Sequence, residues 1–310
     1  MRTLIPATMC LLALTVGALA QSSDPQTKAQ QILLQARAAI ASEAQLKSLQ
    51  TLSVLYTSSR TIGAAYFESD IEYDILLPDK FRRRESRQPF TTVTVMQDEN
   101  ALTYSVPNPA SGGDAFRENS PAPQAQARRR ADFTRVLLSL LLRTPSEKAL
   151  EYRYAGEHTE PDGTAEMVDV KGEDGFAARL YIDQKTHRLV ALSYRAKQLS
   201  HAVRAMARLA INTPPQRPTQ TPKKLTPEEQ AQLQVERWAE VEKRRKQFEE
   251  ALENAPEVEY RWTFGEFKSV KGFTLPHHLT KAEANYEYEE WNISSYKINP
   301  KFPPTVFGAK

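Results

Sequence analysis

Acidic side chains are the first candidates for chemistry in this sequence of 310 residues. Four acids occupy alternate positions from Glu68 to Asp74, and a second group holds Glu287, Glu289 and Glu290. Two carboxylates hydrolyse a glycoside only when they flank a cleft at a set separation. In the first run the acids alternate with apolar residues, so on a strand all four would face the outer surface. We therefore expect no catalytic pair among them.

The histidines and the single cysteine do not form a recognisable site either. His277 and His278 are adjacent on a predicted strand, so their side chains point to opposite faces and cannot easily share one metal ion. The sequence contains no G-x-S-x-G, G-x-x-x-x-G-K or H-E-x-x-H motif. Cys10 lies in the leader described below, which excludes thiol catalysis and thiolate metal sites from the mature chain. We expect no catalytic residue, no metal and no cofactor.

A run of three arginines, Arg82-Arg83-Arg84, is the most informative basic feature. On a strand Arg83 shares its face with Phe81, so Arg83 would point inward while its two neighbours face water. An inward arginine must pair or meet a polar group of a ligand. Two interpretations stay open: a salt bridge with the outer acidic strand, or contact with an anionic headgroup or an acidic partner. The formal net charge of the whole chain is only +3, which gives no basis for nucleic-acid binding.

The first 20 residues have the three parts of a secretory signal peptide. A positive start at Met1-Arg2 precedes an apolar run over residues 7–17, and Ala18-Leu19-Ala20 supplies a small-x-small cleavage site. The apolar run is shorter than the roughly 20 residues that span a bilayer. We therefore expect an exported, periplasmic protein without a membrane span, whose single domain covers residues 21–310. Lipid modification at Cys10 is the alternative interpretation.

Most of the remaining sequence alternates with a period of two, which indicates an antiparallel sheet with one wet face. After one helix from Asp24 to about Leu49, short strands follow one another through tight turns. So many strands without alternating helices predict a mainly β (α+β) fold, in which a strongly curved antiparallel sheet forms a half-open barrel. The predicted strands are Leu52–Ser58, Phe67–Ile75, Lys80–Arg87, Thr91–Gln97, Ala101–Val106, Leu150–Gly156, Thr164–Lys171, Phe176–Asp183, Leu189–Ala196, Val258–Phe264, Phe273–Thr280, Ala284–Trp291 and Ile293–Ile298.

A leucine-rich helix is predicted from Gln124 to Arg143, after a loop over residues 107–123. Apolar residues cover most of its circumference, so it should be buried nearly all round. Two roles stay open for it: a loosely seated lid over a cavity, or a plug that completes a sealed core. The residues that we expect to form the lid are Phe133, Val136, Leu137, Leu140 and Leu141.

Residues 197–256 interrupt the strand pattern, which resumes at Val258. This segment holds a basic amphipathic helix from Leu199 to Leu209, a Pro-rich linker over residues 213–222 and a highly charged helix from Thr226 to Asn254. We interpret it as a helical insertion between two strands. It is either a solvated decoration or an arm that docks an envelope protein partner.

Three short motifs, by their order and spacing, resemble the exported lipoprotein-carrier superfamily of LolA-like, outer-membrane lipoprotein-sorting proteins. They are Leu77-Pro78-Asp79-Lys80-Phe81-Arg82, Gly272-Phe273-Thr274-Leu275-Pro276 and a closing segment of Ile298-Asn299-Pro300 with Phe302 and Phe307. The resemblance covers residues 27–196 and 257–307. The insertion has no counterpart in this pattern, so the cargo and delivery partner of known carriers do not transfer.

The resemblance implies a half-barrel whose apolar concave face shelters acyl chains of a lipid or lipoprotein, without chemistry. It also matches Arg83 to an arginine that lines the carrier's cavity. The alternative is an envelope sensor or scaffold that contacts a protein through the same shell or the insertion. The expected cavity lining is Phe67, Ile71, Tyr73, Ile75, Arg83, Leu102, Tyr104, Val258, Tyr260, Trp262 and Phe264.

Overall fold

The computed structural model describes most of the chain from Asp24 onward. The described residues are 24–62, 65–87, 90–97, 100–107, 116–117, 123–145, 149–160, 163–172, 175–198, 200–202, 226–284 and 286–307. The predicted signal peptide, most of the loop over residues 107–123, the Pro-rich linker and most of the helix from Leu199 lie outside these ranges. None of the helices in the described ranges combines the length and the apolar character that a bilayer crossing needs.

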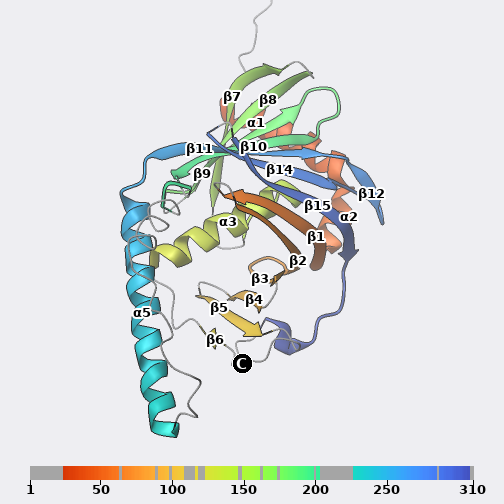
Figure 1. Cartoon of the computed structure of the whole chain (residues 1–310). Helices are drawn as coiled ribbons and strands as arrows, with labels where there is room; N and C mark the ends of the chain where they lie inside the picture. The colour runs from red at the N-terminus through yellow and green to blue at the C-terminus, as the bar shows by residue number, and fades with distance from the viewer. Residues whose placement is uncertain are drawn as a thin grey trace, which may run out of the picture.

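Antiparallel strands of the described chain form one large sheet (Figure 1). Its 13 strands follow the order β6-β5-β4-β3-β2-β1-β15-β14-β11-β10-β9-β8-β7, and β12 and β13 form a separate hairpin. The strands are β1 (Thr51–Ile62), β2 (Ala65–Leu76), β3 (Lys80–Arg87), β4 (Phe90–Gln97), β5 (Asn100–Pro107), β6 (Phe116–Arg117), β7 (Leu150–Glu160), β8 (Gly163–Gly172), β9 (Ala177–Asp183), β10 (Leu189–Lys197), β11 (Glu257–Gly265), β12 (Lys268–Val270), β13 (Phe273–Leu275), β14 (His278–Glu283) and β15 (Tyr286–Ile298).

The sheet curves strongly but does not close, so the predicted half-open barrel is confirmed. Register shifts between β1 and β15 and between β14 and β15 mark bulges in the middle of the sheet. A bulge bends its strand and increases the local twist, so these irregularities help the sheet to curl. The concave face carries the core: Leu52, Val54 and Tyr56, which point inward from β1, are all buried.

The helices occupy three different places around this sheet (Figure 1). α3 crosses the concave face, α1 packs against β7, and α5 stands along one side of the body. The helices are α1 (Pro25–Ile40), α2 (Glu43–Ser48), α3 (Pro123–Leu141), α5 (Pro227–Glu253) and the 3-10 turn η2 (Pro304–Val306).

Three boundaries predicted from the sequence are wrong. The separate strands predicted over residues 284–291 and 293–298 are one continuous strand, β15. The N-terminal helix is two helices, because Ser42 leaves the helical conformation and forms a capping box with Gln45 at the start of α2. The strand predicted over residues 273–280 is split into β13 and β14 at Pro276, which has no amide hydrogen to continue a ladder. The predicted helix over residues 124–143 corresponds to α3 and the predicted strand over residues 80–87 to β3.

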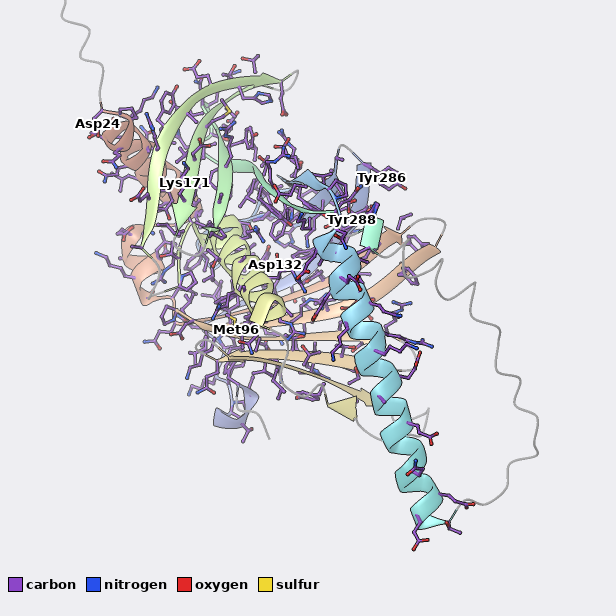
Figure 2. The ribbon with its side chains drawn as sticks, turned by 90° about the vertical axis from the view of Figure 1, so that its left-hand side faces the viewer. Asp24, Met96, Asp132, Lys171, Tyr286 and Tyr288 are labelled. Atoms are coloured by element: carbon purple, nitrogen blue, oxygen red, sulfur yellow. The ribbon has the colours of Figure 1, made fainter. Side chains whose placement is uncertain are left out.

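α5 lies between β10 and β11, which pair directly with each other in the sheet. Near its C-terminal end, Leu252 is buried against the body and Phe248 is half-buried. Glu228 and Glu229 at its N-terminal end are exposed, and Figure 2 shows the helix running away from the sheet in that direction. The helix is therefore attached to the body near one end.

Candidate functional site

The concave face of the sheet is the candidate functional site. Aromatic and aliphatic side chains line it from both halves of the sheet. The rings of Tyr73 and Phe81 stack with centroids 5.1 Å apart, and Phe81 contacts Phe133 of α3 at 4.9 Å. In the other half, Tyr194 stacks on Tyr260 at 5.3 Å, while Arg135 of α3 lies 3.6 Å from the centre of the Tyr194 ring. α3 therefore packs on both halves of this face.

Most residues of the predicted lining share the concave face. Ile71, Tyr73 and Ile75 alternate along β2 with the outward acids and are buried, and Phe67 has the same parity. Their counterparts on β11 are Val258, Tyr260, Trp262 and Phe264, of which the last three are buried.

Two residues of the predicted lining, Leu102 and Tyr104, lie on the opposite face. The ladder pairs Leu102 with Val95, and Val95 with Arg82. Arg82 bonds to Asp74 on the convex side, so β5 directs Leu102 and Tyr104 to that side as well. The prediction fails here because alternation shows which residues share a face but not which face is concave.

α3 occupies the concave face in this structure. The side chains of Phe133, Leu137 and Leu141 have no exposed surface, and Val136 and Leu140 are buried as well. The sequence leaves two roles open for this helix, a loosely seated lid or a plug. In this structure the helix is packed tightly against the sheet.

A row of polar side chains crosses the concave face on four neighbouring strands. The register sets Trp262 of β11 opposite Lys281 of β14, Lys281 opposite Glu289 of β15, and Glu289 opposite Arg60 of β1. Directly opposed residues of an antiparallel pair have their side chains in contact range. We call Arg60, Lys281 and Glu289 the charged row.

Glu289 is the centre of the charged row. Its Oε1 accepts hydrogen bonds from the Arg60 guanidinium at 3.1 Å, from the Trp291 indole at 2.6 Å and from the Ser58 hydroxyl at 3.0 Å. Its Oε2 faces the Lys281 ammonium at 3.5 Å. Burial alone would raise the pKa of the Glu289 carboxyl, but the cations of Lys281 and Arg60 and the indole donor hold that pKa well below its ordinary value.

Lys281 lies between two indole rings. Its ammonium is 4.0 Å from the centre of the Trp291 ring and 4.5 Å from that of Trp262. Burial lowers the pKa of this ammonium, the nearby arginines lower it further, and Glu289 opposes the change. The faces of the Trp262 and Trp291 rings attract a cation, so they favour the charged form of Lys281 that burial disfavours.

Arg83 points inward, as its parity with Phe81 predicts. Its Nη1 donates to Glu85 of the same strand at 2.6 Å. Burial alone would lower the pKa of the Arg83 guanidinium, but Tyr56 and Glu85 raise that pKa above its ordinary value. Arg82 and Arg84 instead bond to the acids of β2 on the convex side. The interpretation of a salt bridge with the acidic strand therefore applies to these two outward arginines, and not to Arg83.

Sequence reasoning missed the charged row. Arg60 lies beyond the end of the strand predicted over residues 52–58, and the sequence assigns no face to Glu289. One signal was available: on β14, Lys281 and Glu283 have the parity of Leu279, which places two charges on the apolar side of the strand. Polar residues at inward positions of a strand require an explanation.

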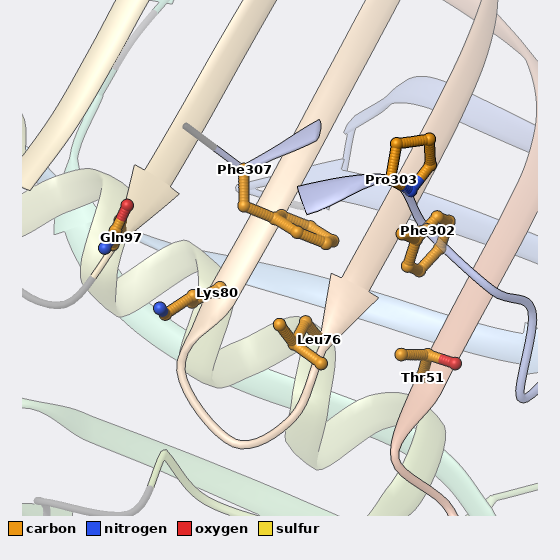
Figure 3. A pocket seen from close by; sticks show the side chains of 7 residues that line it. All are labelled: Thr51, Leu76, Lys80, Gln97, Phe302, Pro303 and Phe307. Atoms are coloured by element: carbon orange, nitrogen blue, oxygen red, sulfur yellow. The ribbon is translucent and has the colours of Figure 1, made fainter. Parts of the chain in front are cut away.

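A separate pocket of about 240 Å³ lies at the ends of β1 to β4 (Figure 3). The closing segment of the chain supplies Phe302, Pro303 and Phe307, whose side chains lie over the strands in Figure 3. The sheet supplies Thr51, Leu76, Lys80 and Gln97. In that view α3 lies behind the sheet, so this pocket belongs to the convex side.

No family model and no curated protein matches the sequence. Solved structures do match. A domain from Vibrio parahaemolyticus, provisionally described as that of an outer membrane lipoprotein-sorting protein, has a TM-score of 0.50 and 8% identity, covering 91% of this chain and 97% of its own. A DUF1329 family protein from Desulfovibrio piger has a TM-score of 0.50 and 7% identity, covering 92% and 98%. A LolA superfamily protein from Nitrosomonas europaea has a TM-score of 0.49 and 9% identity, covering 91% and 97%.

This chain shares its fold with the domain from Vibrio parahaemolyticus and the DUF1329 family protein. The two structures with a TM-score of 0.50 are similar to it over nearly their whole lengths. The resemblance predicted from the three short motifs is thereby confirmed for the fold. Because identities are below 10%, the comparison concerns the fold alone.

Proposed function

We propose that this protein is an exported, periplasmic carrier that shelters an acyl chain of a lipid or lipoprotein on its concave face, without chemistry. One observation carries the proposal. Among the described helices, α3 packs against aromatic side chains of both halves of the concave face, through Phe133 and Arg135, while α1 covers β7. A ligand that displaces this one helix gains access to the lining without any change in the sheet.

The exchange of α3 for an acyl chain is energetically balanced. The buried large apolar side chains of α3 contribute about 9 to 18 kcal/mol, at 1.5 to 3 kcal/mol for each of Phe133, Val136, Leu137, Leu138, Leu140 and Leu141. A chain of about 16 carbons gains roughly 12 kcal/mol, at 0.8 kcal/mol per CH₂. A long acyl chain can therefore replace the α3 side chains on the same wall.

α3 is tied to the body at its C-terminal end, next to α2. Arg143 donates to the carbonyl oxygens of Leu46 at 3.2 Å and Leu49 at 3.4 Å, and Arg37 donates to the carbonyl of Leu142 at 3.3 Å. Within the helix, the hydroxyl of Thr134 bonds back to the carbonyl of Arg130 and so needs no partner on the sheet. We propose that α3 pivots about its C-terminal end as a lid.

Tryptophan fluorescence tests this function, because two of the three tryptophans lie together in the proposed site and the third belongs to a different element. Trp262 and Trp291 line the concave face, whereas Trp238 belongs to α5. In a Trp238→Phe variant, a spin-labelled fatty acid should quench most of the emission. In the matched Trp262→Phe, Trp291→Phe variant, which retains only Trp238, the same ligand should leave the emission nearly unchanged.

The result is checked by native mass spectrometry of the gently purified protein, which should show bound lipid. Equal quenching of both variants would place the ligand elsewhere and contradict the proposal. Absence of quenching in either variant, together with lipid-free native protein, would also contradict it.

A further inference from the structure

We infer that the ligand carries an anionic head group, a carboxylate or a phosphate, and that Arg60 and Lys281 of the charged row bind it. This inference rests on the proposed function, because it adds a head-group site to the acyl-binding wall. The alternatives are a neutral head group, such as an ester or an amide, and a purely structural role for the charges.

The ion pairs of the charged row favour an anion. Arg83 pairs with Glu85, and Asp132 on α3 pairs with Arg135 at 2.8 Å. Glu283, on the same side of β14 as Lys281, accepts hydrogen bonds from Ser200 and Tyr260 instead. Arg60 and Lys281 therefore share a single carboxylate, that of Glu289.

The exposure of the side chains places the two arginines where a ligand can reach them, while Lys281, at 11% exposed, lies deeper beside Glu289. The Glu289 side chain is 5% exposed, whereas Arg60 is 31% and Arg83 is 23% exposed. The carboxylate at the centre thus lies beneath the guanidinium groups. The Arg60 Nε is buried and has no hydrogen-bond partner in the described part of the chain. A buried donor without an acceptor is unfavourable, and an incoming oxygen would satisfy it.

Two partly desolvated cations that share one carboxylate are costly unless another anion joins them. An anionic head group would supply a second negative charge and would accept a hydrogen bond from the Arg60 Nε. An ion pair between the head group and these cations would also discriminate against a neutral ester or amide, because a neutral head group does not supply the negative charge.

The apolar wall extends far enough from the charged row to hold the tail. From Arg60 to Leu52, β1 runs eight residues toward α2, which is about 26 Å at 3.3 Å per residue. One acyl chain spans half of a bilayer core, or roughly 15 Å. A head group at Arg60 and Lys281 would thus direct the tail along the concave face toward the α2 end.

Three ligands with the same tail test the inference by displacement of a fluorescent fatty acid at pH 7: palmitate, hexadecyl phosphate and methyl palmitate. The native chain should bind at least one anionic ligand about 10- to 100-fold more tightly than the ester, as expected for hydrogen bonds to charged groups. Whichever anion binds more tightly identifies the head group as carboxylate or phosphate.

Arg60→Gln and Lys281→Met should each reduce binding of the preferred anion to near that of the ester, and leave ester binding unchanged. Arg60→Gln is the variant less disruptive to folding, because this side chain is partly exposed. The matched control is Arg84→Gln, which removes a guanidinium on the convex face. This variant should bind the anion and the ester as tightly as the native chain does.

The outcomes separate the inference from the proposed function. If all three ligands bind equally, the anion site is refuted while the carrier stands. An equal loss of anion and ester binding in Arg60→Gln would also refute the site. If none of the three binds, the carrier itself is refuted.

Discussion

Glu289 connects the two cations of the charged row, so its carboxylate balances both of them at neutral pH. Replacement by Gln keeps the size of the side chain and removes the negative charge between Arg60 and Lys281. Removing one partner of a buried pair leaves an uncompensated charge. We predict that Glu289→Gln lowers the free energy of unfolding at pH 7 by roughly 3 kcal/mol, measured by urea denaturation.

The pH dependence of this loss has a definite sign. The folded pKa of Glu289 lies below its ordinary value of 4.5, so its stabilisation is complete above that value and is lost as the pH falls toward the folded pKa. The native chain should therefore lose stability between about pH 5 and pH 2 more steeply than Glu289→Gln. Parallel curves for the two proteins would contradict the assigned role of this carboxylate.

Arg83 and the charged row differ in how far the sequence predicts them. The parity of Arg83 with Phe81 on a single strand is enough to point it inward. Arg60, Lys281 and Glu289 come together only through the register of three strands and a bulge, which a single sequence does not specify. The same limit explains why Leu102 and Tyr104 were assigned to the wrong face.

At the scale of elements, α3 is the part that must move, and cysteine accessibility can follow it. In a background without Cys10, Leu137→Cys places a thiol on α3, and Leu46→Cys places a matched thiol in α2; both native side chains have no exposed surface. We predict that palmitate accelerates maleimide labelling of Cys at position 137 several-fold, because α3 is displaced, and leaves position 46 unchanged. Equal rates with and without palmitate at position 137 would contradict the lid.

The insertion is a second element with a testable boundary. Lys197 and Glu257 are opposite each other in the β10–β11 ladder, so a two-residue Asn-Gly turn can replace residues 198–256 and close the hairpin. We predict that this deletion retains the β-rich circular dichroism spectrum and acyl binding. The melting temperature should fall by several degrees, because buried contacts of Leu252 and Ala255 are lost. Loss of acyl binding by a folded deletion variant would assign the insertion to the site.

Element types were predictable because their patterns are long and local. The alternation in β2 and β11 and the leucine-rich run of α3 predict strands and a buried helix directly. Boundaries were harder. The break between α1 and α2 depends on the cap at Ser42, and the break between β13 and β14 follows from a proline inside an otherwise continuous pattern.

At the scale of the whole molecule, one open sheet makes two different surfaces. Its concave face holds the apolar wall, the charged row and α3, while its convex face holds the acids of β2 and the pocket around Phe302 and Phe307. A ligand can therefore be assigned to a face by its position alone. The fold comparison supports the sheet and its curvature, and the ligand depends on the side chains of this chain.

The most direct test of the acyl-binding concave face is a crystal structure with 16-bromohexadecanoate, in which anomalous scattering locates the end of the tail. The bromine peak should lie on the concave face between the sheet and α3, near Tyr56 and Val54, with the carboxylate at Arg60 and Lys281. A single bromine peak in the convex pocket at Phe302 and Phe307, with α3 unmoved, would contradict the account.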